Sequence, residues 1–118
     1  MNQDLKKEKS AKEAFSFIEK DIKKDSVIGI GTGTTTNFFI EELNKARIHI
    51  KGVVCSSEAS EKLIDRSYEV LSLNEVHSID FYIDGADEYN DRKELIKGAV
   101  ELLQEKKYLL IHQTSLFV

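Results

Sequence analysis

The chain has 118 residues, which is enough for one compact domain and too few for two ordinary ones. Hydrophobic residues make up 41% of the chain and charged residues 32%, a balance that favours a soluble globular fold over a disordered chain. The formal net charge of -4 argues against a nucleic-acid partner, because a phosphate backbone binds basic surfaces. A small anionic ligand stays possible, since it needs only a few local donors.

Cysteine usage and hydropathy indicate where the protein acts. Cys55 is the single cysteine, so an internal disulfide is excluded and a reducing compartment is favoured. No apolar run approaches the roughly 20 residues of a membrane span. The segment from Met1 to Lys9 is polar and charged, unlike a secretory signal. These features predict a cytoplasmic domain without a membrane partner.

The first predicted elements are a helix, a strand and a second helix. Ser10-Ala-Lys-Glu13 has the pattern of a capping box, followed by apolar residues at helical spacing. The run Ser26-Val-Ile-Gly-Ile30 is typical of a buried strand that ends in a glycine-rich turn. A second helix is expected from Thr35 to about Lys45.

The remaining elements continue this alternation. Strands are expected at 50–55, 68–71, 79–83 and 108–111, and helices at 57–65 and 98–106. Alternating strands and helices favour an α/β fold, with a Rossmann-like, mostly parallel sheet covered by helices on both faces. Ligands of such sheets bind at the loops that leave the carboxyl ends of the strands.

The first candidate site is the glycine- and threonine-rich run Gly29-Ile-Gly-Thr-Gly-Thr-Thr-Thr36, which follows a predicted strand and opens a predicted helix. Glycine lets the backbone approach a ligand closely, and the amides of a helix start attract anions. The dinucleotide fingerprint is excluded, because its third glycine would fall at Thr34. A phosphate or carboxylate site is predicted; the alternative is a plain turn capped by threonine.

The second candidate site is the acidic run Asp84-Gly-Ala-Asp-Glu88 at the end of a predicted strand. Asp84 and Asp87, three residues apart, can converge on one ligand, where they accept hydrogen bonds from sugar hydroxyls or move protons. A magnesium site is one alternative, because hard cations prefer oxygen ligands. The other alternative is a solvated acidic turn that caps the next helix.

Lys97-Gly98 follows a polar stretch and offers a positive charge to an enolate or a phosphate. Taken alone, Lys97 is more often a surface residue. Glu101 and Glu105 are expected one turn apart on the same side of the predicted helix, where a solvated face is the alternative to a function.

Together these segments resemble the ribose-5-phosphate isomerase A family, in the family's order and at close to its spacing. The segments that carry the resemblance are Gly29-Ile-Gly-Thr-Gly-Thr-Thr35, Cys55-Ser-Ser-Glu-Ala-Ser60, Leu73-Asn-Glu-Val76, Asp80-Phe-Tyr-Ile-Asp-Gly-Ala-Asp-Glu88 and Leu95-Ile-Lys-Gly98. The resemblance covers nearly the whole chain up to Gly98. It implies one domain over residues 1–118, about half the family's length, with the second lobe and part of the sheet absent.

The resemblance also implies a reaction. In this family ribose 5-phosphate and ribulose 5-phosphate, metabolites of the non-oxidative pentose phosphate pathway, interconvert through ring opening and an enediolate, without a metal or organic cofactor. Asp84 and Asp87 are implied to contact sugar hydroxyls and help open the ring, and Lys97 to stabilise the charge of the intermediate. The implied substrate-binding residues are Thr32, Gly33, Thr34, Thr35, Asp84, Gly85, Ala86, Asp87, Lys97 and Gly98.

The chain departs from the family after Gly98. The family has further glycines there and then a Glu-Lys pair whose glutamate accepts the proton. The pair here is Glu105-Lys106, so Glu105 is the predicted base, with Glu101 in reserve. The family's Asp-x-Ser-Lys-like loop corresponds to Gln113-Thr-Ser115-Leu116, which lacks the acidic residue and the lysine.

The sequence therefore supports three hypotheses about function. The first is an active isomerase, the second an inactive truncated remnant that at most binds sugar phosphate, and the third a regulatory sugar-phosphate-binding domain. The family is commonly oligomeric, so a homo-oligomer is a further expectation. A sheet without its later strands exposes an unpaired edge, which predicts poor solubility or loose packing of the isolated chain.

Overall fold

The computed structural model describes residues 3–31, 34–86, 96–103 and 107–117, with side chains at 8–9, 11–31 and 36–85. Strands and helices alternate through the first part of the chain, and the last part is a pair of strands. In chain order the described elements are α1 (Gln3–Glu19), β1 (Val27–Ile30), α2 (Thr34–Ala46), β2 (Gly52–Cys55), α3 (Glu58–Leu63), the 3-10 helix η1 (Leu73–Glu75), β3 (Ser78–Ala86), β4 (Ile96–Leu103) and β5 (Lys107–Phe117).

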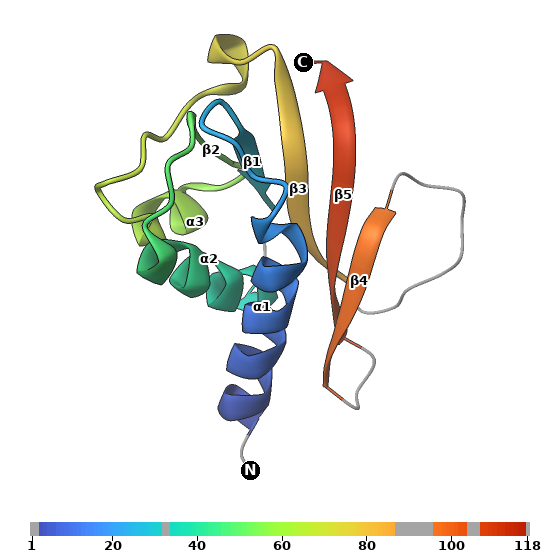
Figure 1. Cartoon of the computed structure of the whole chain (residues 1–118). Coiled ribbons are helices and arrows are strands. Elements are labelled where there is room, and N and C mark those ends of the chain that lie inside the picture. Colours follow the sequence, from blue (N-terminus) through green and yellow to red (C-terminus); the bar gives the residue numbers. More distant parts are fainter. Residues whose placement is uncertain (1–2, 32–33, 87–95, 104–106, 118) are drawn as a thin grey trace.

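The strands form one five-stranded sheet in the order β2-β1-β3-β5-β4 (Figure 1). β2 and β3 both pair with β1 in parallel, whereas β5 pairs antiparallel with β3 and with β4. Beyond β2, Val70 forms an isolated parallel bridge with Val53. The predicted α/β class and the parallel arrangement of the first strands are thereby confirmed.

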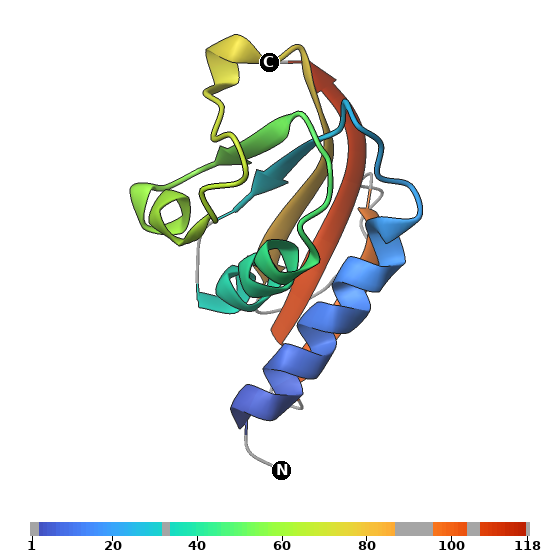
Figure 2. The ribbon, with the colours of Figure 1, turned by 60° about the vertical axis from the view of Figure 1, so that its left-hand side comes forward.

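One face of the sheet is covered by α1 and α2, which lie side by side in front of it (Figures 1 and 2). α2 is helical because its apolar residues recur every three or four positions, and Phe39, Ile40 and Leu43 are all buried. They meet Ile28 and Ile30 of β1 in the main hydrophobic cluster. This core ties both helices to the parallel strands.

The opposite face is covered by the connection from Val70 back to β3, which includes η1. Leu71 and Val76 of this connection are buried in a second cluster with Val27, Val54 and Ile79 of the strands. The connection from β1 to β2 therefore crosses one face of the sheet, and the connection from β2 to β3 crosses the opposite face. β2 and β3 lie on opposite sides of β1, so the strand order reverses between β1 and β3.

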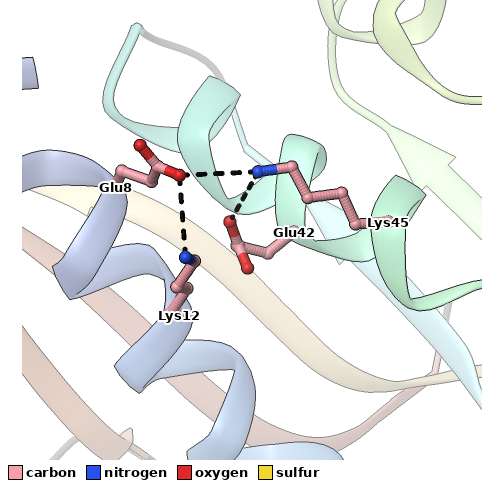
Figure 3. A network of polar contacts seen from close by, with 4 residues as sticks. All are labelled: Glu8, Lys12, Glu42 and Lys45. Carbon is pink, nitrogen blue, oxygen red and sulfur yellow. Dashed lines mark ion pairs between the residues drawn. The ribbon is translucent and has the colours of Figure 1, made fainter. Parts of the chain in front are cut away.

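A small network of ion pairs joins α1 to α2 (Figure 3). Lys45 Nζ lies 3.5 Å from Glu8 Oε1 on α1 and 3.5 Å from Glu42 Oε2 on its own helix. The charge of Glu42, followed by that of Glu8, holds the pKa of Lys45 above its ordinary value. Because Lys45 is exposed, solvent screens these pairs, and the apolar cluster beneath contributes more to docking.

Three predicted elements differ from the structure. The helix predicted at 98–106 is wrong, because residues 96–103 form β4 and pair with β5. The capping box at Ser10 is wrong as well, since α1 already begins at Gln3 and runs through this position. The strand predicted at 68–71 is reduced to the single bridge at Val70.

The error at β4 has a physical reason. Ala, Leu and Glu favour a helix locally, so the run Ala99-Val-Glu-Leu-Leu103 resembles a helical segment. β5 supplies the backbone partners of this run, with Ala99 opposite Leu110 and Val100 opposite Leu109. Pairing with β5 outweighs the helix propensity of this run, because the helix propensities of ordinary residues differ by well under about 1 kcal/mol per residue.

Candidate functional site

The candidate site lies where the strand order reverses, at the carboxyl ends of β1 and β3. In an open α/β sheet the connections from two such neighbouring strands diverge to opposite faces and leave a crevice between them. Here α2 follows β1 onto one face, whereas β3 is reached over the other. Gly31 directly follows β1, and Asp84 of β3 directly follows the last residue that pairs with β1.

Gly31 and Asp84 are in direct contact, although 53 positions separate them in the sequence. The Gly31 N–H donates to the carbonyl of Ile83 at 2.7 Å, which extends the β1–β3 pairing by one residue. A Cβ at Gly31 would collide with Asp84 Oδ1 and lie 2.8 Å from its Cγ. A larger residue here would displace the Asp84 carboxylate, so glycine lets this carboxylate approach the backbone next to β1.

The turn after β2 joins the same site through backbone and hydroxyl contacts. The Ser56 N–H donates to the carbonyl of Ile30 at 3.0 Å. The hydroxyls of Ser60 on α3 and Thr36 on α2 both donate to the carbonyl of Gly31, each at 3.4 Å. The predicted helix at 57–65 is confirmed as α3, and Ser57 caps it by accepting from the Ser60 N–H.

Tyr82 forms one wall next to these residues. Its ring lies over Gly29, where an added Cβ would be 2.6 Å from Tyr82 Cδ1. Partial burial raises the pKa of Tyr82, and the charge of Asp84 raises it further, while a hydrogen bond with Ser56 acts in the opposite direction. The phenol therefore stays protonated at neutral pH and is a neutral hydrogen-bonding group at this edge.

The described residues thus bring the Asp84 carboxylate, the Tyr82 phenol and the exposed Ser56 to the carboxyl edge of the parallel strands. The hydroxyls of Thr36 and Ser60 are buried and bonded to the Gly31 carbonyl. Carboxylate and hydroxyl oxygens suit the hydroxyl groups of a sugar. Among the residues that the structure describes, no group of three or more His, Cys, Asp or Glu side chains is placed to hold a metal ion. Over the same residues, every helix is too short or too polar to span a membrane.

Comparison with known proteins assigns the family. Residues 51–117 match the family model described as ribose 5-phosphate isomerase A (phosphoriboisomerase A). A curated ribose-5-phosphate isomerase A from Mannheimia succiniciproducens is 46% identical over 108 residues, 91% of this chain and 48% of the relative. The enzyme of the same name from Pasteurella multocida is 51% identical over 87 residues, which are 73% of this chain and 40% of the relative.

The chain belongs to the ribose-5-phosphate isomerase A family. A solved structure from Neisseria gonorrhoeae, also named ribose 5 phosphate isomerase A, is 42% identical and superposes with a TM-score of 0.62. The match covers 83% of this chain and 42% of that structure. The chain therefore spans about half the length of the relatives that it matches.

The residues predicted for a ribose-5-phosphate isomerase fall into four groups, the last of which lies in β4. Asp84 and Gly85 lie in β3 at the candidate site, and the strand continues to Ala86, so Asp84 belongs to the strand and not to a loop. Thr34 and Thr35 begin α2. Thr32, Gly33, Asp87 and Glu105 lie outside the described residues, as does Glu88 of the acidic run.

Lys97 and Gly98 lie in β4, two strands away from β3. Ile96 is opposite His112 and Gly98 opposite Ile111, and these β5 residues are opposite Tyr82 and Ile83 of β3. Lys97 is therefore level with Tyr82 and Ile83, about 10 Å from them across β5, whereas Asp84 is level with Ala99. Glu101, the reserve base, lies further along β4 opposite Tyr108; it is not on a helix with Glu105.

Sequence reasoning included Thr36 in the glycine- and threonine-rich run, but on single residues it missed Ser60 as a member of this site. Both are buried, with 0% and 3% of their surface exposed. The only earlier sign was the run Cys55-Ser-Ser-Glu-Ala-Ser60 among the segments that resemble the family. Its serines directly follow a predicted strand, which is where a ligand-binding turn of a parallel sheet is expected.

Proposed function

We propose that this chain takes part in the interconversion of ribose 5-phosphate and ribulose 5-phosphate. The observation that carries the proposal is the contact of Gly31 with Asp84 at the point where the strand order reverses. Membership of the ribose-5-phosphate isomerase A family supports it. A sugar phosphate is a charged metabolite that membranes retain inside cells, which supports a cytoplasmic location.

The proposed binding step uses both candidate loops. The amides and threonines that open α2 hold the anionic end of the substrate, because a helix start favours negative charge. The Asp84 carboxylate, with Asp87, accepts hydrogen bonds from the sugar hydroxyls and takes up the hydroxyl proton as the ring opens. Gly85, Ala86 and Gly98 line the same pocket in this proposal.

The proposed chemical step is a proton transfer between neighbouring carbons. Glu105 removes the C2 proton of the open aldose, and the electron pair moves onto the carbonyl oxygen to give an enediolate. Lys97 stabilises the charge that develops on this oxygen. A proton then moves from the C2 hydroxyl to the oxygen on C1, and Glu105 returns its proton to C1 as the C2 carbonyl of the ketose forms. No oxidant or reductant is consumed.

Deuterium exchange tests the proposal. In deuterated water an active chain exchanges the C2 hydrogen of ribose 5-phosphate, which NMR follows directly. Replacing the base, Glu105→Gln, is expected to slow exchange at least about 100-fold. Glu13→Gln, at an exposed position of α1, is the matched control and is expected to retain full exchange.

A second candidate function is binding of sugar phosphate without catalysis. It is favoured by Gln113 and Leu116, which stand where the family's Asp-x-Ser-Lys-like loop carries its acidic residue and its lysine. Line broadening of ribose 5-phosphate without any exchange at C2 would support this candidate over the isomerase. Preferential binding of a different sugar phosphate would instead favour a regulatory domain. The expected homo-oligomer stays a prediction.

A further inference from the structure

The side chain of Tyr82 crosses β1 and brings its hydroxyl to the candidate site. Gly29 lies opposite Tyr82 in the pairing of β1 with β3, and an added Cβ there would be 2.6 Å from Cδ1 and 3.3 Å from Cε1 of the ring. The ring therefore occupies the space that a side chain at position 29 would fill. Its hydroxyl is hydrogen-bonded to Ser56, which directly follows β2. Tyr82 thus reaches from β3 across β1 to the end of β2.

Asp84 lies on the same face of β3 as Tyr82. Side chains two residues apart on a strand project to the same face, and the two glycines beside them repeat this spacing. Gly29 leaves room for the Tyr82 ring, and Gly31 leaves room for the Asp84 carboxylate. The two groups are close enough for the charge of Asp84 to contribute to the raised pKa of Tyr82. A carboxylate and a protonated phenol therefore lie together at the carboxyl edge of β1 and β3.

Ser56 holds the hydroxyl of Tyr82 at this edge. The Ser56 N–H donates to the carbonyl of Ile30 at 3.0 Å, which ties the turn after β2 to the last residue of β1. The ring of Tyr82 packs against the apolar cluster that includes Val54 and Ile79, whereas its hydroxyl meets a serine that is exposed. The polar end of Tyr82 is therefore the end that faces the site.

We propose that Tyr82 is a further substrate-binding residue, whose phenol donates a hydrogen bond to the sugar hydroxyl that the Asp84 carboxylate holds. A sugar hydroxyl has one hydrogen to donate and lone pairs that accept. An ionised carboxylate only accepts, so the hydroxyl bound to Asp84 needs a donor from another group, and the phenol supplies it. Ser56 donates to the phenol oxygen, so the phenol hydrogen is directed to the sugar. This inference rests on the proposed function, because it adds a contact to the same substrate.

Tyr82→Phe tests the inference, with Tyr68→Phe as a matched control. The Tyr68 hydroxyl donates to the carbonyl of Leu43 at 2.6 Å and accepts the N–H of Ile48 at 3.0 Å, near the last turn of α2. Both variants keep the aromatic ring and lose one hydroxyl. Tyr68→Phe is expected to lower the melting temperature and to bind normally. Only Tyr82→Phe is expected to weaken ribose 5-phosphate binding, by about tenfold in an NMR titration.

A labelled ring carbon and a serine variant test the contact without removing the phenol. With ¹³C at the Cζ atom of each tyrosine, ribose 5-phosphate is expected to shift the Tyr82 signal and to leave the Tyr68 signal in place. Ser56→Ala, at an exposed position, is expected to fold normally and to weaken binding by about threefold. Its effect should not add to that of Tyr82→Phe in the double variant, because the serine acts through the phenol.

The possible outcomes separate the inference from the proposed function. If the unmodified chain neither binds ribose 5-phosphate nor exchanges its C2 hydrogen, the proposed function fails and the contact of Tyr82 fails with it. If the unmodified chain binds and Tyr82→Phe binds equally well, only the contact is overturned. Equal weakening by Tyr68→Phe would also overturn it, since the effect would then reflect stability alone. Should Tyr82→Phe not fold, a Tyr82 Cζ signal that stays in place while ribose 5-phosphate binds overturns the contact.

Discussion

The two ends of the β1–β3 pair each carry an aspartate of β3, and the two aspartates differ in what they contact. At the amino end, Asp80 Oδ2 accepts the N–H of Val27 at 2.7 Å and so completes the backbone pairing of β1. At the carboxyl end, the N–H of Gly31 is already bonded to the Ile83 carbonyl. Asp84 lies over Gly31 without being needed for that pairing, and its carboxylate stands at the edge where the strand order reverses.

The surroundings of the two ends differ as well. Near Asp80 there is a small pocket of about 130 Å³, whose lining includes Lys51 and His77 besides Asp25 and Asp80. Near Asp84 the neighbours are Gly31 and the phenol of Tyr82. Acidic residues beside a parallel sheet therefore do not mark a site by themselves. The carboxyl end differs in that the strand order reverses there and α2 begins beside it.

The largest expected effect separates these two aspartates. Asp84→Asn keeps the size of the side chain but removes its charge and its ability to take up a proton. We expect the C2 exchange rate to fall about 100-fold or more. Asp80→Asn is the matched variant on the same strand; it is expected to lower stability by about 1 kcal/mol and to leave exchange unchanged. Urea unfolding and the exchange assay measure the two effects separately.

Comparable exchange rates for the two asparagine variants would remove the distinction between the ends. A loss of exchange in Asp80→Asn while the protein remains folded would move the chemistry to the amino end.

A second test concerns how far the polar edge extends beyond β1. Cys55 ends β2 next to Ser56 and is half-buried against the main core. Burial, helped by the charge of Glu61, raises the pKa of Cys55 to about 11. The thiolate is therefore scarce at pH 8, and alkylation by iodoacetamide should be about tenfold to a hundredfold slower than that of free cysteine.

The same shift gives a pH dependence with a definite sign. Because the folded protein has the higher thiol pKa, the stability that Cys55 contributes is present below about pH 9 and is lost as the pH rises toward 11. Alkylation in urea at pH 8, where the thiol is exposed, is the control and should be fast. Equally rapid alkylation of the folded chain would mean that Cys55 is open to solvent and that the polar edge extends past β2.

The sequence is sufficient to predict the parallel part of the sheet and the edge at which the candidate site lies. Val27 to Ile30 is an uninterrupted apolar run, and Phe39, Ile40 and Leu43 repeat at helical spacing, so local patterns predicted both elements. The rule that ligands bind at strand carboxyl ends then selected the regions around Gly31 and Asp84. The contact between them is visible only in three dimensions, because it depends on the register of β1 and β3.

Other features depend on partners distant in the sequence. Residues 99–103 form a strand because β5 pairs with them, and nothing in the local pattern distinguishes this run from a helix. The shared use of the Gly31 carbonyl by Thr36 and Ser60 requires α2 and α3 to be in place. Such contacts between non-adjacent elements have no periodic pattern in the sequence.

The most direct test of the account is a map of where ribose 5-phosphate binds. The ¹⁵N-labelled chain is titrated with ribose 5-phosphate and the backbone amide shifts are followed by NMR. The account predicts that the amides of Gly31, Ser56 and Gly85 move, while those of Val27, Lys51 and Ser78 at the opposite end of the strands stay in place. Shifts confined to the second group, with none at Gly31 or Gly85, would contradict it.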